Sequence, residues 1–259
     1  MTLLTDCHEQ RIAFPLMNIL ALDTCFGACS VAACRAETEV VRAFELRQTG
    51  HAEALMPMVE RVMAEAGLSF SDLERIAVTT GPGSFTGMRI GVAAARALAL
   101  ATGARLAGFS TLQVMAETAR ARHAAGLPLG EPRAVLPDYI LVAVDARKEQ
   151  VYAQLFGRDA SLIAPAAVLS PQDAATLLPD APVAIVGSGA GCVAAAVSSA
   201  RANIITLYPD LQPDAACLAV MAARMGPDQD AESAATIRPL YLRPPDAKPQ
   251  HGKSIPRLT

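Results

Sequence analysis

Short apolar runs near the start of the chain predict strands at 18–22, 28–34 and 40–46. The turn between the first two strands carries Asp23 and Thr24, so the pair is expected to form a hairpin with an acidic tip. Because all three runs are short and bounded by turn residues, strands fit them better than helices.

The next apolar stretch has the spacing of a helix. Between 52 and 66, apolar side chains recur on one helical face, and Gly67 is placed to end the helix. A buried strand at 73–79 then leads through a glycine-rich turn into a second helix at 86–101. Strands followed by a strand–turn–helix unit indicate a mixed α/β lobe.

The second half of the chain repeats these kinds of element. It contains an apolar run at 106–109, a helical stretch at 113–123, and a Gly- and Pro-rich loop at 124–138. A hairpin with a second acidic tip at Asp145 follows, although no repeat is visible in the residues themselves. We divide the chain into an N-terminal extension, a first lobe, a second lobe, a helix that returns to the first lobe and a C-terminal tail, at 1–16, 17–104, 105–208, 209–232 and 233–259.

Composition agrees with two lobes in a reducing compartment. With 259 residues, of which 52% are hydrophobic, the chain can bury two cores of ordinary size. The net charge is −3 and the Lys and Arg residues are scattered, which argues against strong direct binding of nucleic acid. The cysteines lie in apolar stretches without metal-ligand spacing, so we expect buried thiols, a cytoplasmic location and no membrane span.

The turn GPGSFTGMRIG lies where a strand passes into a helix, so its amides and the helix N-terminus can bind an anion. It matches neither a Walker loop nor a dinucleotide fingerprint, and a tight structural turn explains the glycines equally well. With the acidic tip of the first hairpin, it gives a candidate nucleotide or anion site. The candidate residues are Asp23, Thr24, Gly81, Gly83 and Ser84.

Small residues line one face of the helix at 86–101. Such a face lets another element approach closely, either inside the lobe or on a partner subunit, and the sequence leaves both alternatives open. With the apolar face of the helix at 52–66, it forms a candidate docking surface. Its residues are Leu55, Met58, Val59, Val62, Gly87, Gly91, Ala94 and Ala95.

No catalytic or metal site is recognisable. Two imidazoles on one helical face require HxxxH, and here His51 is followed by Leu55 at the second position. Ser84 and Ser110 lack evident His and Asp partners for a nucleophilic triad. The sequence therefore predicts neither a metal ion nor a catalytic residue.

Six segments resemble, in order, the bacterial TsaB (YeaZ) family. They are ILALDTCFGACSVA, HAEALMPMVE, IAVTTGPGSFTGMRIGVAAARALA, GFSTLQVMA, VAVDARKEQVYAQLF and PLYLRPPDA, which together span about 19–247. GPGSFTGMRIG is the most specific of them. The resemblance implies a two-lobed actin-like (ASKHA, ribonuclease H-like) α/β fold with mixed sheets flanked by helices.

The resemblance also implies a role. It is that of a non-catalytic subunit that pairs with the catalytic protein TsaD, so that threonylcarbamoyl is transferred to the adenosine 3′ of the tRNA anticodon. A TsaE-type ATPase is the implied further partner, and a homodimer through the same helices is expected to compete with TsaD. Contact with tRNA is expected only through the complex. No tightly bound cofactor is expected in this chain, and ATP or ADP would belong to the complex.

Two other functions are compatible with the superfamily. The first alternative is an ATP-dependent small-molecule phosphotransferase, which needs a general base near an acceptor pocket. The second is a peptidase, for which the chain offers neither a triad nor a zinc pair. The resemblance does not explain the extension at 1–16, which leaves both Met1 and Met17 as start residues, or the loop at 124–138.

Overall fold

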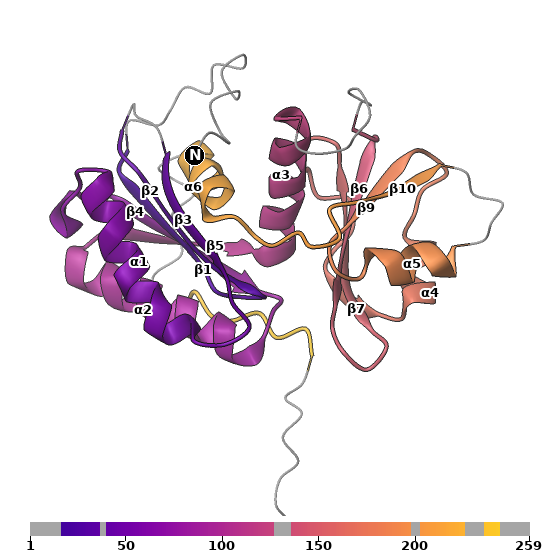
Figure 1. Ribbon diagram of the computed structural model, residues 1–259, viewed down its shortest axis with the longest axis horizontal. Coiled ribbons are helices and arrows are strands. Elements are labelled where there is room, and N and C mark those ends of the chain that lie inside the picture. Colours follow the sequence, from indigo (N-terminus) through magenta and orange to yellow (C-terminus); the bar gives the residue numbers. More distant parts are fainter. Residues whose placement is uncertain (1–16, 37–39, 127–135, 198–202, 226–235, 244–259) are drawn as a thin grey trace, which may run out of the picture.

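The computed structural model describes residues 17–36, 40–126, 136–197, 203–225 and 236–243, which form two lobes side by side (Figure 1). The predicted extension at 1–16, most of the predicted loop at 124–138 and the end of the tail lie outside the described residues. Each lobe is built on one five-stranded sheet.

The first sheet and the elements around it come from the first half of the chain. Its elements are β1 (Ile19–Asp23), β2 (Ala28–Cys34), β3 (Val40–Leu46), α1 (His51–Glu65), η2 (Phe70–Asp72), β4 (Arg75–Gly81), α2 (Phe85–Thr102) and β5 (Arg105–Ser110). The predicted hairpin and both predicted helices are present, with ends that differ by a few residues.

The second sheet and the connecting helices follow. These elements are α3 (Thr111–Ala124), β6 (Tyr139–Asp145), β7 (Val151–Gly157), β8 (Ala167–Leu169), α4 (Pro171–Thr176), β9 (Val183–Val186), α5 (Ala190–Ala196), β10 (Ile204–Leu207) and α6 (Ala215–Arg224). The sequence did not predict β8, α4, α5 or β10, because such short elements hold too few residues to show a period.

Both sheets have the same topology. The first has the order β3-β2-β1-β4-β5, and the second, read from its other edge, has the order β8-β7-β6-β9-β10. In each order the first three strands are antiparallel to their neighbours within that group. The third, fourth and fifth strands are parallel to one another. The mixed sheets of the expected two-lobed actin-like fold are therefore confirmed. The strand order also shows that the second sheet repeats the first, a duplication that is not visible in the amino-acid sequence.

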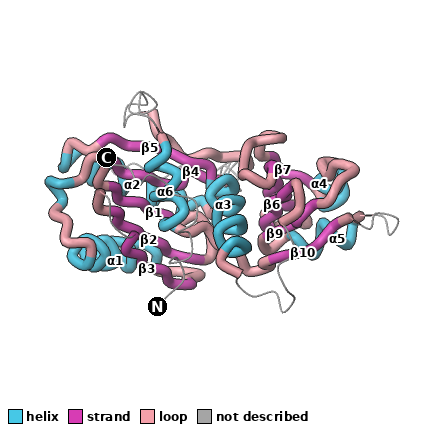
Figure 2. Tube along the Cα trace, turned by 90° about the horizontal axis from the view of Figure 1, so that it is seen from above, coloured by secondary structure: helices cyan, strands magenta, loops and turns pink. Residues whose placement is uncertain are grey.

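Helices cover both faces of each sheet. Alternate residues of β1 point to opposite faces, so that Leu20 and Leu22 pack with α1 and α2, whereas Ile19 and Ala21 pack with α6. In the second lobe α3 packs on one face of the sheet and α4 and α5 on the other. Figures 1 and 2 both place α3 between the two sheets.

The two lobes exchange helices. Helix α3 follows the last strand of the first sheet but packs on the second sheet, and α6 follows the last strand of the second sheet but packs on the first. Strand β5 pairs with β4, so the predicted boundary between 104 and 105 is wrong, since the first sheet continues to Ser110. A strand's partner depends on contacts distant in sequence, which local patterns do not reveal.

Helix α6 is held on the first sheet at both ends. Asp214 accepts a hydrogen bond from Ala216 N at the N-terminus and forms a 2.8 Å ion pair with Arg42 of β3. At the C-terminus the fully buried Arg75 donates to the carbonyl oxygens of Ala222 and Met225. A cation there is favoured by the helix dipole.

Among the described residues, no helix combines the length and hydropathy needed to cross a bilayer.

Candidate functional site

The glycine-rich turn joins β4 to α2 and lies against the turn that follows β1. Ser84 caps α2, because its Oγ accepts a hydrogen bond from Gly87 N at 3.0 Å. The Ser84 N–H donates in turn to Cys25 O at 2.7 Å. The two turns are therefore joined through the residue that starts the helix.

Protein atoms fill the space beside the glycines of this turn. A Cβ on Gly83 would lie 2.6 Å from Cys25 O, and one on Gly81 would lie 2.9 Å from Leu240 O. Gly81 also has a φ of +121°, which side chains rarely adopt. Because both glycines are buried against other segments, the structure favours the tight-turn interpretation over an open anion cradle.

The carboxylate of Asp23 points into the protein. It is fully buried, accepts a 2.5 Å hydrogen bond from Thr79 Oγ1 on Oδ1, and leaves Oδ2 without a hydrogen-bond partner within the described part of the chain. Burial raises the pKa of Asp23 from 3.8 to about 7, and the Thr79 hydrogen bond opposes that shift. Thr24 is also fully buried, and its hydroxyl donates to Gly87 O at 2.6 Å.

The structure thus brings Asp23, Thr24, Gly81 and Gly83 together, but as a packed junction between two turns. Of the predicted anion-site residues, only Ser84 is exposed. An aspartate that ligates a phosphate-bound metal ion has to reach that ion, and the arrangement of Asp23 does not allow this without a rearrangement.

Sequence reasoning missed the polar side chains that surround Asp23. Cys25 Sγ lies 3.2 Å from Thr79 Oγ1, and burial raises the pKa of its thiol above the ordinary value. Thr111, the first residue of α3, is fully buried close to the Cys25 thiol. The signal that could have found Thr79 is the pair of threonines, Thr79 and Thr80, directly after the apolar run of β4.

Other cysteines were predicted with partial success. Cys29 and Cys34 are buried free thiols as expected, but Cys192 is exposed and Cys217 is half-buried. Cys7 lies outside the described residues.

His51 is the first residue of α1 and has a structural contact. Its Nε2 lies 3.1 Å from Phe26 O and donates to it when the proton is on Nε2. Phe26 in turn packs against Tyr152 of the second lobe, with ring centroids 6.3 Å apart. In the described ranges, no group of three or more His, Cys, Asp and Glu residues is arranged to hold a metal ion.

The predicted partner surface is wrong for most of its residues. Leu55, Met58, Val59, Val62, Gly87, Gly91 and Ala95 are buried within the lobe, and Ala94 is partly buried. The apolar stripe of α1 packs on the first sheet, and the glycines of α2 let that helix approach Thr24. The spacing identified the buried face of each helix correctly, but it did not reveal that the chain's own sheet covers that face.

The opposite faces of α1 and α2 remain exposed. Met56 is 38% exposed, Phe85 43% and Leu100 87%. Helices α1 and α2 lie next to each other on the outer side of the first lobe (Figure 1). We define the outer face by the exposed residues Met56, Phe85, Arg89, Ala93, Arg96, Ala97 and Leu100.

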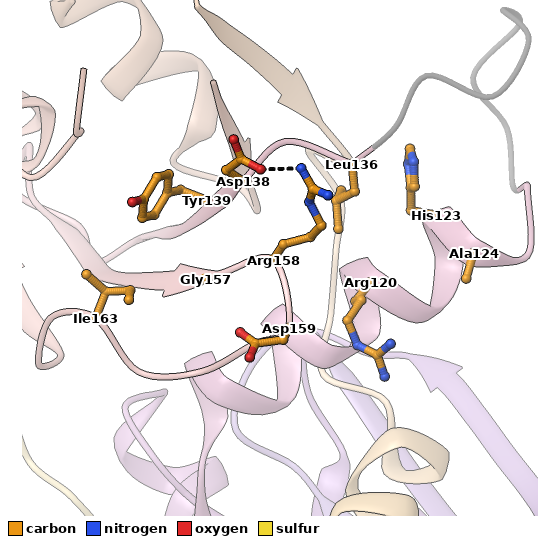
Figure 3. Close-up of a pocket in the computed structure, with 10 residues that line it drawn as sticks. All are labelled: Arg120, His123, Ala124, Leu136, Asp138, Tyr139, Gly157, Arg158, Asp159 and Ile163. Carbon is orange, nitrogen blue, oxygen red and sulfur yellow. Dashed lines mark hydrogen bonds and ion pairs between the residues drawn. The ribbon is translucent and has the colours of Figure 1, made fainter. Parts of the chain in front are cut away.

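A cavity of about 660 Å³ lies on the second lobe, away from the predicted site (Figure 3). Arg120 and His123 of α3 line one side, and the ion pair between Arg158 and Asp138 lies on another. Its lining mixes cations, acids and apolar residues, and none of the predicted site residues contributes to it.

Two copies of one mixed five-stranded sheet, each ending its first strand in an aspartate, define a two-lobed protein of the actin-like fold class. The family model described as "TsaD: tRNA N6-adenosine threonylcarbamoyltransferase" matches residues 45–248. The chain belongs to this family, as a TsaB (YeaZ)-type member.

Individual relatives agree with this assignment. The chain is 38% identical over 143 residues to "tRNA threonylcarbamoyladenosine biosynthesis protein TsaB" of Escherichia coli, a match that covers 55% of this chain and 56% of that protein. The TsaB protein of Bacillus subtilis is 33% identical over 54% of this chain and 55% of its own length. The chain thus spans about half the length of these curated relatives. The solved structure "YeaZ from Pseudomonas aeruginosa" superposes with a TM-score of 0.74 and 29% identity, covering 87% of this chain and all of that one.

Replacing Gly87 by Ala tests the junction. An added Cβ would lie 2.0 Å from Thr24 O, so α2 has to shift, and we expect a loss of about 1–3 kcal/mol of stability in thermal unfolding. Gly191→Ala is the matched control, because Gly191 also lies in a helix but has nothing within 4 Å of the added Cβ. Equal melting temperatures for the two variants would contradict the contact.

Replacing Asp23 by Asn tests its protonation. Since the folded pKa lies near 7 and above the ordinary 3.8, wild-type stability falls as the pH rises through this window. The Asn variant lacks this penalty, so its Tm relative to wild type should increase by a few degrees between about pH 5 and about pH 8. If the curves of Tm against pH run parallel for the two proteins, burial does not raise the pKa of Asp23.

Proposed function

We propose that this chain is a non-catalytic subunit that binds a TsaD-type catalytic protein through its outer face. The reaction that it supports is transfer of threonylcarbamoyl to the adenosine 3′ of the tRNA anticodon. Family membership and the names of the curated TsaB relatives support this role.

The observation that carries the proposal is the exposed, mainly apolar face of α2, whereas the exposed side of α1 carries Glu53, Glu60 and Glu65 as well as Met56. Exposed methionine, aromatic and arginine side chains are enriched at protein interfaces, and Met56, Phe85 and Arg89 are of these kinds. Leu100 projects almost completely into solvent. Helix α2 contains no acidic residue, so its outer face presents only the cations Arg89 and Arg96 among its small and apolar residues. A partner surface with acidic and apolar residues would complement it.

The inward orientation of Asp23 supports the non-catalytic part of the proposal. A phosphotransferase of the same superfamily would need an accessible carboxylate and a phosphate cradle, whereas Asp23 is fully buried and Gly83 packs against Cys25. No observation favours the phosphotransferase alternative over the subunit role.

The remaining partners follow from the same proposal. A TsaE-type ATPase would join the complex, ATP or ADP would be bound there, and a second copy of the chain would compete for the outer face. Contact with tRNA would occur through the complex, in agreement with the net charge of −3. The complex would work in the cytoplasm.

Leu100→Glu tests docking on the outer face. A carboxylate in an apolar interface loses its hydration, so we expect co-elution with the TsaD-type partner to be lost, with at least a tenfold weaker Kd. The monomer should keep its Tm, because Leu100 is 87% exposed.

Leu162→Glu is the matched control for docking. Leu162 is also a leucine in contact with solvent, at 61% exposure, but it lies on the second lobe. The control should pair normally. If both variants co-elute with the partner as wild type does, the outer face is not the docking surface.

Depletion of the protein tests the cellular role. We expect threonylcarbamoyladenosine to disappear from tRNAs that read codons beginning with adenine, as measured by mass spectrometry of digested tRNA. Wild-type protein should restore the nucleoside, and Leu100→Glu should restore it poorly. Unchanged modification after depletion would rule out the proposed role.

A further inference from the structure

The C-terminal segment Thr236–Arg243, which we call the clasp, crosses from the first lobe to the second (Figure 1). Ile237 is buried in the core of the first lobe. Its side chain packs against β5, where a Cβ on Gly108 would lie 3.4 Å from Ile237 Cγ2. One end of the clasp is therefore anchored by apolar packing.

The middle of the clasp lies over the junction and the start of α2. Leu240 N donates to Thr80 O at 2.7 Å, beside the glycine-rich turn. The Tyr241 ring lies 5.4 Å from that of Phe85, and Arg89 Nε donates to Tyr241 OH at 2.8 Å. The Arg89 guanidinium also lies 3.7 Å above the centre of the Phe85 ring. Such contacts between a cation and a ring face are favourable.

This aromatic group is part of the outer face. Phe85 and Arg89 belong to that face, and Tyr241 extends it with 41% of its surface exposed. A protein docked over Phe85 would therefore also cover Tyr241. The outer face and the clasp are therefore joined by contacts between their side chains.

The far end of the clasp binds the second lobe through Arg243. Its Nη1 donates to Ala146 O at 2.6 Å, in the turn between β6 and β7. A hydrogen bond from a charged donor is stronger than one between neutral groups. This turn holds the position in the second sheet that the turn after Asp23 holds in the first.

The turn bound by Arg243 is strained. Arg147, Lys148 and Glu149 follow one another with φ of 63°, 52° and 58°. Residues other than glycine rarely adopt left-handed backbone, because it brings Cβ too close to the following carbonyl oxygen. Arg147 N donates to Asp145 Oδ1 at 2.7 Å, which helps to hold this conformation. Backbone of this kind persists only where the surrounding contacts hold it in place.

We propose that the clasp couples the outer face to the β6–β7 turn. A protein docked over Phe85 and Tyr241 immobilises the clasp, Arg243 then stays bound to Ala146 O, and the turn keeps its left-handed conformation. Without the docked protein, the Arg243 contact opens more often and the turn relaxes. This inference rests on the proposed docking at α2, but the free chain tests its first half independently.

Hydrogen exchange of the full-length chain measures the coupling. The N–H groups of Ala146, Arg147 and Gln150 are bonded within the turn. In Arg243→Ala we expect these amides to exchange on the order of tenfold faster, the effect of one lost charge-assisted hydrogen bond. Arg238→Ala is the matched control, because Arg238 lies on the same segment and is exposed.

Arg243→Lys gives a second, conservative variant, since lysine can still donate to Ala146 O. It should exchange close to the wild-type rate, and unchanged exchange of β6 and β9 amides in every variant reports that the lobe stays folded. If Arg243→Ala exchanges in the turn no faster than Arg238→Ala, the clasp does not hold the turn and the proposal is overturned.

Addition of the TsaD-type partner tests the second half. In wild type we expect the turn amides to exchange more slowly after docking, and in Arg243→Ala we expect the partner still to bind without slowing them. The same slowing in both proteins would overturn the coupling. Failure of the partner to bind wild type would instead reject the docking proposal, while the free-chain measurement continues to decide whether Arg243 holds the turn.

Discussion

The start of α2 touches the backbone of the turn after β1, and the geometry of the first lobe depends on this contact. Thr24 Oγ1 donates to Gly87 O, and no side chain fits between Gly87 and Thr24. The contact holds α2 close to the sheet with its outer residues in solvent, and the neighbouring carboxylate of Asp23 is fully buried. A helix N-terminus that packs on another turn is also less open to a phosphate.

The same contact explains why a site built from residues typical of nucleotide binding does not serve as an open cradle in this structure. Asp23 and Gly81 lie at the ends of β1 and β4, but Cys25 and Leu240 fill the space beside Gly83 and Gly81. The first lobe is more closely packed there than a ligand site requires, and the helix that emerges from the turn has its opposite face exposed to solvent. We therefore interpret the turn mainly as a packed junction that fixes the position of α2.

Much of the fold was predictable because its signals are local. The hairpin of β1 and β2, the length of α1, and the start of α2 just after the glycine-rich turn follow from apolar spacing and turn residues within a few positions. The place of β5 and the burial of the small face of α2 were not predictable, since both depend on segments far away in sequence. Gly87 and Gly91 look alike whether a helix approaches its own sheet or another protein. Only the structure distinguishes these two uses.

The exchange of α3 and α6 between the lobes also has a consequence for biosynthesis. The second sheet receives α3 from residues made before it, whereas the first sheet lacks α6 until the second lobe has been made. A chain emerging from the ribosome therefore carries a first sheet whose face with Ile19, Ala21 and Ala77 still lacks α6 while residues 111–214 are being made. The lobe that begins first is completed last.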